Sequence, residues 1–581
     1  MSAIVLAVIG LFGFITGYRF YSRFISEKIL RLDPDFRTPA HEFEDGVDFV
    51  PTNKMVLWGH HFTSVAGAAP IVGPAIAVIW GWLPAFLWVV FGTVFFAGVH
   101  DAGALWASSR NKAKSIGALT ESVIGPRARS VFMIVIFLLL LMVNAVFAIV
   151  IANLFISVPS SVLSAWIVIP IAMTIGFLVY RRGVGLLGPS VVGLILLYIA
   201  MWAGDYVPVV LPDEVAGVAA PAVWVLALFA YAGIASVLPV WALLQPRDYI
   251  NGLQLFVALG VIYLAVVIGN PTIVAPAWNG EAASALGAPS FVPLLFVTIA
   301  CGAISGFHGL VSSGTTSKQL NKETDVRFVG YLGAVGEGTL ALAAIIACTA
   351  GFASVADWNA FYTSFAAGGT DAFVRGGARI VNLGLGLPVA FSETLLAVMA
   401  VLFAATTMDT GVRLQRYIVQ EWGEIYGIGL LKGRTAATLI AVGSCIALAF
   451  GAGGAAGAGG MIIWPLFGTT NQLLAGLTLL VISVLLLKMG RPIRYTLVPL
   501  TFLLVMATWA LIIQLRQFWD SSSYFLVFMD VLILGATILV ALEAVAALRR
   551  ERPGGRGGPG AAPAGMGAVN SDAPATLPVP R

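Results

Sequence analysis

The sequence predicts an all-α membrane protein that crosses the bilayer many times. Hydrophobic residues fill 59% of the 581 positions and charged residues only 10%, a balance that a water-facing surface cannot cover. Apolar runs recur along the chain, each close to the ~20 residues that a membrane-spanning helix needs. Lys and Arg gather in alternate connections, with 27 on one side and 3 on the other. Together these observations predict about 15 transmembrane helices.

The charge distribution also predicts the orientation. Cytoplasmic loops retain positive charge, so we expect the C-terminus in the cytoplasm and the N-terminus outside. Arg19 and Arg23 follow the first apolar run instead of preceding it, which favours a retained helix. The net charge of +4 comes from few residues gathered in the connections, so we expect membrane lipid, and no nucleic acid, as a partner.

The predicted spans follow one another with short connections. They cover residues 2–25, 55–79, 83–107, 131–156, 163–180, 184–203, 221–244, 249–270, 291–316, 328–350, 383–412, 435–451, 461–487, 495–515 and 521–547. We expect residues 1–54 to form an extra helix and a cytoplasmic loop, 55–490 a core with inverted repeats, 491–548 a helix pair, and 549–581 a disordered cytoplasmic tail rich in Pro, Gly and Ala. The Gly-rich run 451–460 is expected to be a flexible outer loop.

The stretch 58–79 combines an apolar character with polar side chains and helix-breaking residues. Gly67 and Gly73 weaken the helical backbone there, and Pro70 and Pro74 remove backbone donors. We therefore expect a helix interrupted within the membrane, an arrangement that usually marks a substrate or ion site. The alternative is a kinked packing helix. The polar side chains of this stretch that we place near a substrate are His60, His61 and Ser64, beside the backbone of Gly67.

A second stretch, 298–320, has a similar composition of glycines, hydroxyls and one histidine. Such a run can satisfy an unwound backbone or bind a carboxylate, since half-helix amides attract anions. Its candidate substrate-binding residues are Ser305, His308, Ser312, Ser313 and Thr315.

Ionisable residues inside apolar spans are costly unless they are paired or hydrated, so we treat them as candidates for proton coupling. They are His100, Asp101, Glu337 and Asp409. His100 and Asp101 are adjacent and point about 100° apart on a helix, so both face protein only if that helix is buried all round. Asp409 has the simpler alternative of an ion pair with Arg413, four residues on.

Helices of similar composition but opposite direction indicate an inverted repeat. The span 55–79 runs outward, whereas the spans 221–244 and 291–316 run inward. A five-helix repeat pairs 55–79 with 221–244, which also holds Pro239 and has Arg247 at its inner end. A seven-helix repeat pairs it with 291–316. We favour the first pairing.

A metal-binding protein or metal transporter is the alternative function. Histidine with carboxylate suits Zn, Fe or Mn, and four of the five histidines lie in spans. No cofactor is assigned from the sequence, and a metal ion is the one bound group left open. Its candidate ligands are His60, His61, His100, Asp101 and His308. No HExxH or comparable spacing is present, so we do not expect an enzyme.

Five segments together resemble the carbon starvation protein (CstA) family. They are GHHFTSVAGAAPIVGP, LPVWALLQPRDY, IACGAISGFHGLVSSGTTSK, ETDVRF and IWPLFGTTNQLLA, and the resemblance covers most of residues 50–490. It implies a multi-pass secondary transporter of the bacterial inner membrane with a LeuT-like, APC-type core. It further implies uptake of peptides or of pyruvate, the latter with protons.

The sequence departs from the expected family pattern at His100, where the enteric form is expected to have Gln. The connection between the spans 328–350 and 383–412 is also short. From the resemblance and the polar residues within the spans, we expect proton-coupled import of a carboxylate-bearing nutrient by alternating access. The choice between peptide and pyruvate, the choice between proton and sodium, and the oligomeric state stay open.

Overall fold

The computed structural model describes residues 1–46, 48–452 and 459–550. Most of the predicted tail and of the predicted outer loop 451–460 lies outside these residues. The first half of the described chain contains α1 (Ala3–Thr16), α2 (Ser22–Phe24), α3 (Pro39–Glu42), α4 (Lys54–Val65), α5 (Ala69–Ala77), α6 (Trp82–Gly92), α7 (Gly98–Arg110), α8 (Ile116–Val123), α9 (Pro126–Ser157), α10 (Ser160–Arg182), α11 (Leu187–Tyr206), α12 (Ala220–Val237) and α13 (Leu244–Gly269). The second half contains α14 (Gly280–Ala285), α15 (Phe291–Thr298), α16 (Gly306–Gly314), α17 (Leu332–Ala350), α18 (Val355–Phe361), α19 (Thr370–Leu385), α20 (Val389–Ile425), α21 (Gly429–Lys432), α22 (Arg434–Gly451), α23 (Gly459–Lys488), α24 (Arg494–Asp520) and α25 (Tyr524–Arg550).

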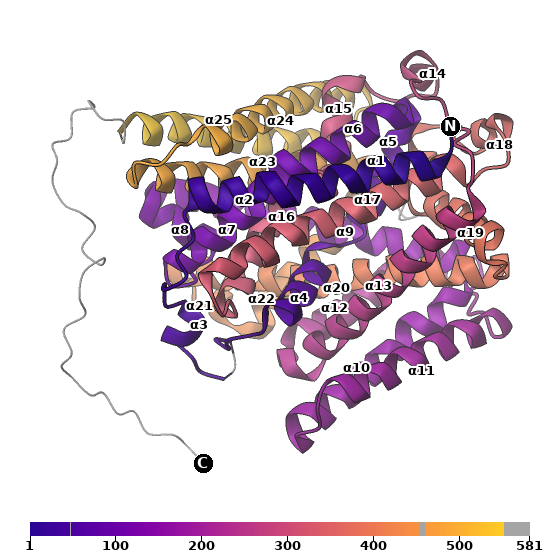
Figure 1. Ribbon diagram of the computed structural model, residues 1–581, viewed down its shortest axis with the longest axis horizontal. Coiled ribbons are helices and arrows are strands. Elements are labelled where there is room, and N and C mark those ends of the chain that lie inside the picture. The colour runs from indigo at the N-terminus through magenta and orange to yellow at the C-terminus, as the bar shows by residue number, and fades with distance from the viewer. Residues whose placement is uncertain (47, 453–458, 551–581) are drawn as a thin grey trace.

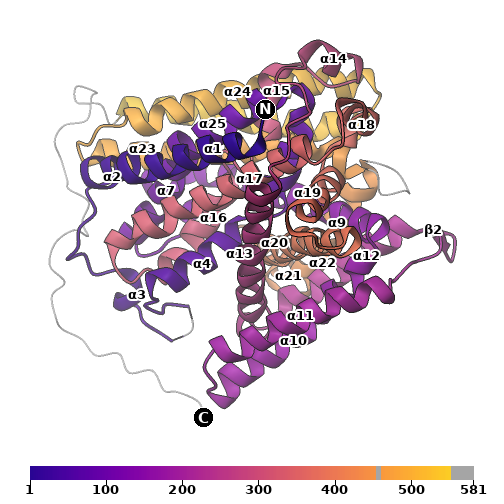
Figure 2. The same ribbon diagram turned by 45° about the vertical axis from the view of Figure 1, so that its right-hand side comes forward.

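The long helices lie side by side in one bundle (Figures 1 and 2). At its centre α9 packs against α20 and α23. The pair α10 and α11 lies along one edge of the bundle (Figure 1). Strands β1 (Glu214–Val215) and β2 (Val218–Ala219) form one small antiparallel hairpin before α12. The predicted all-α membrane fold is confirmed.

Thirteen helices of the described chain are long and apolar enough to cross a membrane, and the pair α4 and α5, bent by 51°, makes a fourteenth. The remaining predicted span, 291–316, consists of α15 and α16, which are too short to count as one spanning helix. The predicted number of about 15 is therefore not confirmed by helix length and composition.

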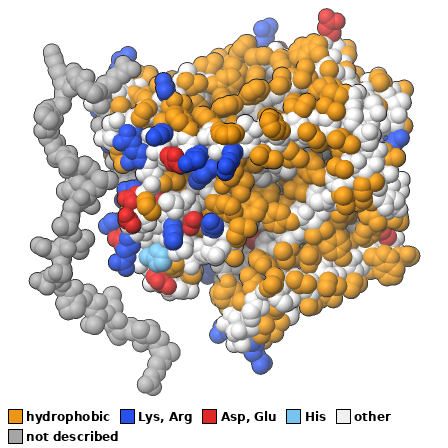
Figure 3. All heavy atoms as spheres, in the orientation of Figure 1, with side chains coloured by type: hydrophobic (Ala, Val, Ile, Leu, Met, Phe, Trp, Pro, Cys, Tyr) orange, Lys and Arg blue, Asp and Glu red, His pale blue; other side chains and the backbone are white. Residues whose placement is uncertain are grey.

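Lys and Arg side chains gather at one end of the bundle, and apolar side chains cover most of the rest of the visible face (Figure 3). The long helices run roughly between this charged end and the opposite one (Figure 1). A broad apolar belt between two ends is the surface that a bilayer requires.

The first span continues past α1 through π-helical turns to Leu30. Its backbone is held by Arg327, whose guanidinium donates to the carbonyl of Tyr18 at 2.9 Å and to the hydroxyl of Ser22 at 2.8 Å. Arg327 belongs to the ETDVRF segment, which precedes α17. The first span is thus tied to the helix α17 by an arginine that supplies donors to a loosened backbone.

The preferred repeat, which pairs 55–79 with 221–244, is not supported by a break inside α12. Helix α12 runs unbroken from Ala220 to Val237 and ends before Pro239, which restricts the residue before it to extended backbone. Arg247 lies in the first turn of α13 and not at the end of the preceding helix. The second discontinuous helix is instead the pair α15 and α16.

Candidate functional site

The break between α4 and α5 is built on Gly67. Its neighbours Ala66 and Ala68 are fully buried, so no solvent reaches the interrupted backbone. A Cβ atom at Gly67 would lie 2.8 Å from the hydroxyl of Thr407 on α20 and 3.1 Å from the ring of Phe147 on α9. Only glycine lets the break approach these two helices so closely. The prediction of an interrupted helix is confirmed.

The break between α15 and α16 is held open by side chains of other helices. The carbonyl of Thr298 accepts from the indole of Trp464 at 3.2 Å, and that of Ile299 from Trp88 at 3.3 Å. The hydroxyl of Thr93 donates to the carbonyl of Gly302 at 2.9 Å. A carbonyl left unpaired in a membrane interior is costly, and these donors remove that cost.

The two discontinuous helices cross each other next to their breaks. A Cβ atom at Gly73 of α5 would lie 2.6 Å from the carbonyl oxygen of Thr298. In the other break, a Cβ at Gly302, whose φ is +89°, would lie 3.5 Å from Pro70. The small residues therefore let two irregular backbones meet at one place.

Beside this crossing, four ionisable side chains from three helices form a buried relay: His100, Asp101, His308 and Glu337. Asp101 lies between two imidazoles, with Oδ1 at 2.8 Å from His100 Nδ1 and Oδ2 at 2.7 Å from His308 Nδ1. On the far side of the His308 ring, Nε2 lies 3.1 Å from Oε2 of Glu337. That contact is close enough for an ion pair but is not aligned as a hydrogen bond. All four side chains are at most 1% exposed.

His100 and Asp101 both take part because α7 is buried all round at this level. Residues 98–109 have no exposed side chain, so two adjacent residues can each face protein. The relay joins α7 to α16 and α17; α7 packs against both of these helices, and both of them pack against the α4 half-helix.

The charge of the relay depends on the number of protons that it holds. With both carboxylates ionised, a single imidazolium leaves a net charge of about −1, which is expensive in a buried site. One further proton neutralises the group. Gain or loss of this proton therefore changes the charge of a fully buried group.

His61 lies apart from the hydrogen-bonded relay. Its Nδ1 lies 2.9 Å from the hydroxyl of Thr316, and its ring packs against Gly333, where a Cβ atom would come within 2.5 Å. Its Nε2 is buried without a hydrogen-bond partner in the described chain. His60, its neighbour, is half-buried. One imidazole nitrogen of His61 is thus free to meet a ligand.

The predicted hydroxyls divide into two groups. Ser64, Ser313 and Thr315 each donate to the backbone carbonyl four residues earlier, so their protons are used within their own helices. Ser312 is buried, and its hydroxyl has no partner among the residues described. Ser305 is held by the amide of Asn471 at 3.1 Å.

Asn471 also accepts from the backbone N–H of Phe307 at 3.0 Å, at the start of α16. One amide of that half-helix is therefore already paired. Three residues that donate hydrogen bonds to the carbonyls of the second break are not singled out by the sequence pattern. They are Trp88, Trp464 and Thr93, which look like ordinary packing residues in the sequence. Asn471 and Gln472, in contrast, stand out in the sequence as isolated polar positions in an apolar helix.

Asp409 lies in a different place from the other predicted coupling residues. Its Oδ2 is 2.5 Å from Arg247 and accepts from Tyr231 at 2.9 Å, so it joins α20 to α12 and α13. The expected alternative partner, Arg413, instead donates to the carbonyls of Ala235 and Leu238. The structure thus separates Asp409 from the relay.

Within the described residues no group of three or more His, Cys, Asp or Glu side chains is arranged to hold a metal ion. The candidate ligands His60 and His61 are not hydrogen-bonded to the relay, and Asp101 uses both oxygens on imidazoles. The arrangement of these imidazoles and carboxylates therefore suits proton binding better than coordination of a metal ion.

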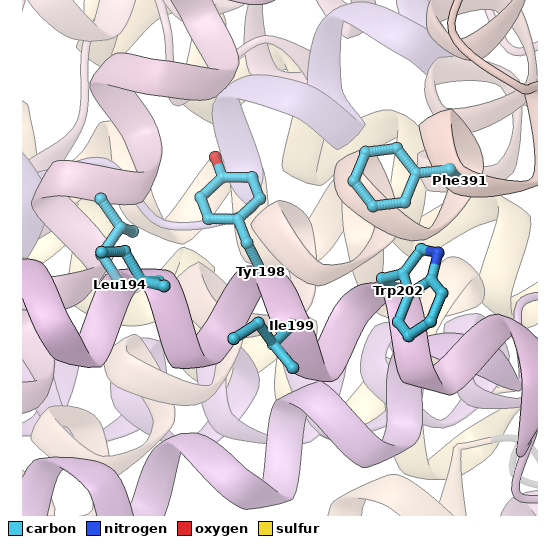
Figure 4. Close-up of a pocket in the computed structure, with 6 residues that line it drawn as sticks. Leu194, Tyr198, Ile199, Trp202 and Phe391 are labelled. Atoms are coloured by element: carbon cyan, nitrogen blue, oxygen red, sulfur yellow. The ribbon is translucent and has the colours of Figure 1, made fainter.

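A separate apolar groove of about 420 Å³ lies between α11 and α20 (Figure 4). Tyr198, Trp202 and Phe391 line it together with aliphatic residues of α11. None of the predicted site residues belongs to this groove.

Comparisons with known proteins connect this arrangement to a family. The chain matches the family described as Carbon starvation protein CstA over residues 2–361 and 352–510. It is 37% identical to the peptide transporter CstA of Campylobacter jejuni, over 87% of this chain and 79% of that protein. It is 32% identical to the pyruvate/proton symporter BtsT of Escherichia coli, over 89% and 82% of the two chains.

Two solved structures align at low identity. One is MhsT in complex with L-phenylalanine, with a TM-score of 0.43, 12% identity and coverage of 85% of this chain and 99% of that one. The other is a mutant of the Eremococcus coleocola manganese transporter, with a TM-score of 0.47, 13% identity and coverage of 87% and 99%. The family match and the identity to full-length relatives show that the chain belongs to the carbon starvation protein CstA family.

Proposed function

We propose that this protein is a secondary active transporter that imports a small carboxylate-bearing nutrient, a peptide or pyruvate, together with a proton. The named relatives support the substrate class, since they are peptide transporters and a pyruvate/proton symporter. The observation that carries the proposal is the relay from His100 to Glu337 beside the crossing of two discontinuous helices.

The proton binds in the relay. Asp101 and Glu337 flank His308, so a proton taken up by either carboxylate can be shared with an imidazole. Its arrival neutralises the buried group. Neutralisation lowers the cost of moving α7, α16 and α17 together within the membrane, which couples the proton to the change of access.

The substrate binds at the crossing of the helices. The Nε2 of His61 and the hydroxyl of Ser312 are polar groups without partners in the described chain, and both lie on half-helices. His60, Ser64, Gly67, Ser305, Ser313 and Thr315 form the surrounding backbone and polar wall in this proposal.

We further propose that α4–α5 and α15–α16 are equivalent elements of an inverted repeat, offset by seven spans. Both are broken, and the predicted inside-to-outside direction of the first is opposite to that of the second. In this arrangement α10 and α11, which lie at the edge of the bundle, are an insertion in the first repeat (Figure 1).

The charged end of the bundle is the cytoplasmic end in this proposal, and the membrane is the bacterial inner membrane. The collection of Lys and Arg at that end supports this orientation (Figure 3).

The test uses purified protein in proteoliposomes, with labelled pyruvate and labelled trialanine as probes. An inward proton gradient should drive accumulation of at least one probe, and an uncoupler should abolish it. Glu337→Gln should keep exchange of the probe but lose gradient-driven accumulation. Accumulation that follows a sodium gradient and survives the uncoupler would contradict proton coupling, and failure to move either probe would contradict the substrate class.

A further inference from the structure

A second set of buried polar residues lines the interface between α13 and α20. On α13 they recur at the spacing of one helix face, and they oppose a similar face of α20. We call this set the inner seam: Arg247, Asn251 and Gln254 of α13, with Thr406, Asp409 and Arg413 of α20. All six side chains are at most 8% exposed. Ordinary helix packing in a membrane does not need so many polar groups.

The deep end of the seam adjoins the break in the first discontinuous helix. The amide of Asn251 donates to the hydroxyl of Thr406 at 2.6 Å. The next residue, Thr407, is the one that meets Gly67 at the break. On the α13 side, a Cβ at Gly252 would lie 2.7 Å from Thr63 of α4. The seam therefore begins next to the proposed substrate site.

The other end of the seam leads toward the charged end of the bundle. Arg413 donates to carbonyls at the end of α12, at 2.9 and 2.7 Å. Arg416, one turn further along α20, is 3% exposed. Arg247 and Arg413 of the seam, followed by Arg416, thus place three arginines between the break and the end at which Lys and Arg gather.

Arg247 uses only one side of its guanidinium group. NH1 lies 2.5 Å from Asp409 Oδ2 and also donates to the hydroxyl of Tyr231. Nε and NH2, which lie together on the other edge, are buried and have no partner among the described residues. This edge presents two parallel N–H groups, the geometry that binds a carboxylate through both oxygens.

The surroundings of this edge also contain unused polar atoms. Both side-chain polar atoms of Gln254 and Oδ1 of Asn251 lack partners in the described chain. Asp248, next to Arg247, is 6% exposed and its Oδ1 has no partner either. Among these groups only the amide nitrogen of Gln254 can donate to a carboxylate, because the unpaired oxygens of Asn251, Gln254 and Asp248 are acceptors.

We propose that Arg247 forms a second, inner binding position for the carboxylate of the transported substrate, on the cytoplasmic side of the helix breaks. The inference rests on the proposed transport of a carboxylate. Asp409 is the resident counter-ion that closes the seam when no substrate is there. A carboxylate on the free edge shares the positive charge of Arg247, weakens its attraction to Asp409 and lets α13 separate from α20.

The experiment compares the two faces of the membrane. Inside-out and right-side-out vesicles carrying the full chain are assayed for exchange of labelled pyruvate and of labelled trialanine. Arg247→Lys keeps a positive charge opposite Asp409 but loses the paired N–H groups. It should raise the half-saturation concentration at the cytoplasmic face about tenfold or more and change that at the outer face less than twofold.

Three further variants complete the test. Arg182→Lys, at the exposed inner end of α10, is the matched control and should leave the half-saturation concentration unchanged at both faces. Arg247→Gln combined with Asp409→Asn removes both members of the ion pair, so neither is left facing a buried counter-charge, and the test remains possible if a single variant fails to fold. It should also lose affinity at the cytoplasmic face. Arg247→Asp combined with Asp409→Arg restores the attraction between the helices but moves the guanidinium, and it should not restore affinity.

The outcomes separate the two proposals. Full recovery in the charge-exchanged variant would show that Arg247 only ties two helices, and would overturn the inner binding position. An equal rise of the half-saturation concentration at both faces in Arg247→Lys, or no rise at either face, would also overturn the inner binding position. Either result would leave the proposed transport intact. If the unmodified protein exchanges neither probe, both proposals fall.

Discussion

Nδ1 of His308 lies 2.7 Å from Oδ2 of Asp101, across the contact between the half-helix α16 and the helix α7. The two residues are 207 positions apart in the chain, and both are fully buried. Because His308 is the third residue after the break, any change in the angle of α16 moves its imidazole relative to Asp101. In the proposed mechanism, this contact links proton occupancy to movement of α16.

The first prediction concerns Asp101. Asp101→Asn removes the only carboxylate that contacts both imidazoles, so the relay can no longer hold its proton between them. We expect gradient-driven uptake of pyruvate or trialanine to fall more than tenfold, with probe exchange retained. The measurement compares both activities in the same proteoliposomes. Equal loss of exchange and uptake in a protein with unchanged melting would place Asp101 in substrate binding instead.

The second prediction concerns the break at Gly67. Gly67→Ala places a Cβ 2.8 Å from the hydroxyl of Thr407, so one of the two helices must shift. We expect a loss of about 1–3 kcal/mol of stability and a marked fall in transport. Gly185→Ala is the matched control, because a Cβ there meets nothing within 4 Å. Thermal melting and uptake of both variants check the prediction, and equal behaviour of the two would contradict it.

The third prediction concerns the ETDVRF segment. Glu323 is fully buried and is bound by the guanidinium of Arg110 at 2.5 and 2.7 Å and by the backbone N–H of Asp33 at 2.6 Å. Glu323→Gln removes the nearest counter-ion of Arg110 and leaves only Asp33, at 4.0 Å, so we expect a loss of about 1–3 kcal/mol. The melting temperature should fall clearly.

Asp520→Asn is the control for this change, since its contact with Arg516 lies at 4.0 Å between largely exposed side chains. Exposed pairs contribute little, so no measurable change in melting is expected there. A fall of similar size in both variants would remove the special role of Glu323.

The sequence predicts much of this architecture because its strongest signals are local. Apolar runs of spanning length and the alternation of Lys and Arg identify the membrane helices. Glycines and prolines at 67–74 predict the first break, since they weaken the backbone at that place. His100, Asp101, His308 and Glu337 stand out because an ionisable residue in an apolar span is rare.

The remaining features depend on contacts between distant segments. Gly233, Ser236 and Pro239 suggest a broken helix in the span 221–244, yet α12 stays continuous to Val237 while the second break occurs at 299–305. That break is stable because Trp88 and Trp464 donate to its carbonyls, and nothing in an indole's sequence position indicates its acceptor. The pairing of Asp409 with Arg247 is missed for the same reason, because Arg413 is the neighbour that sequence spacing suggests.

The fourth prediction concerns orientation. Alkaline phosphatase fused after Arg550 should be inactive, because the charge distribution predicts that the last described helix ends in the cytoplasm. A fusion in the connection after Tyr206, on the side with few basic residues, should be active and serves as the positive control. The reverse pattern of activities would invert the proposed topology.

The fifth prediction tests His61 as a substrate ligand against a purely structural role. Thr316→Val removes the hydroxyl partner of Nδ1 and leaves the imidazole in place, whereas His61→Ala removes both the hydrogen bond and the free Nε2. If Nε2 meets the substrate, His61→Ala should weaken binding of pyruvate or trialanine about tenfold, and Thr316→Val much less. Both variants should melt at lower temperature, by an amount corresponding to about 1–3 kcal/mol, since each leaves a buried partner unpaired. Binding by calorimetry and melting are measured on the same purified samples. Normal binding with lowered melting in both variants would assign His61 to packing, and the interrupted backbone with Ser312 would then carry the substrate site.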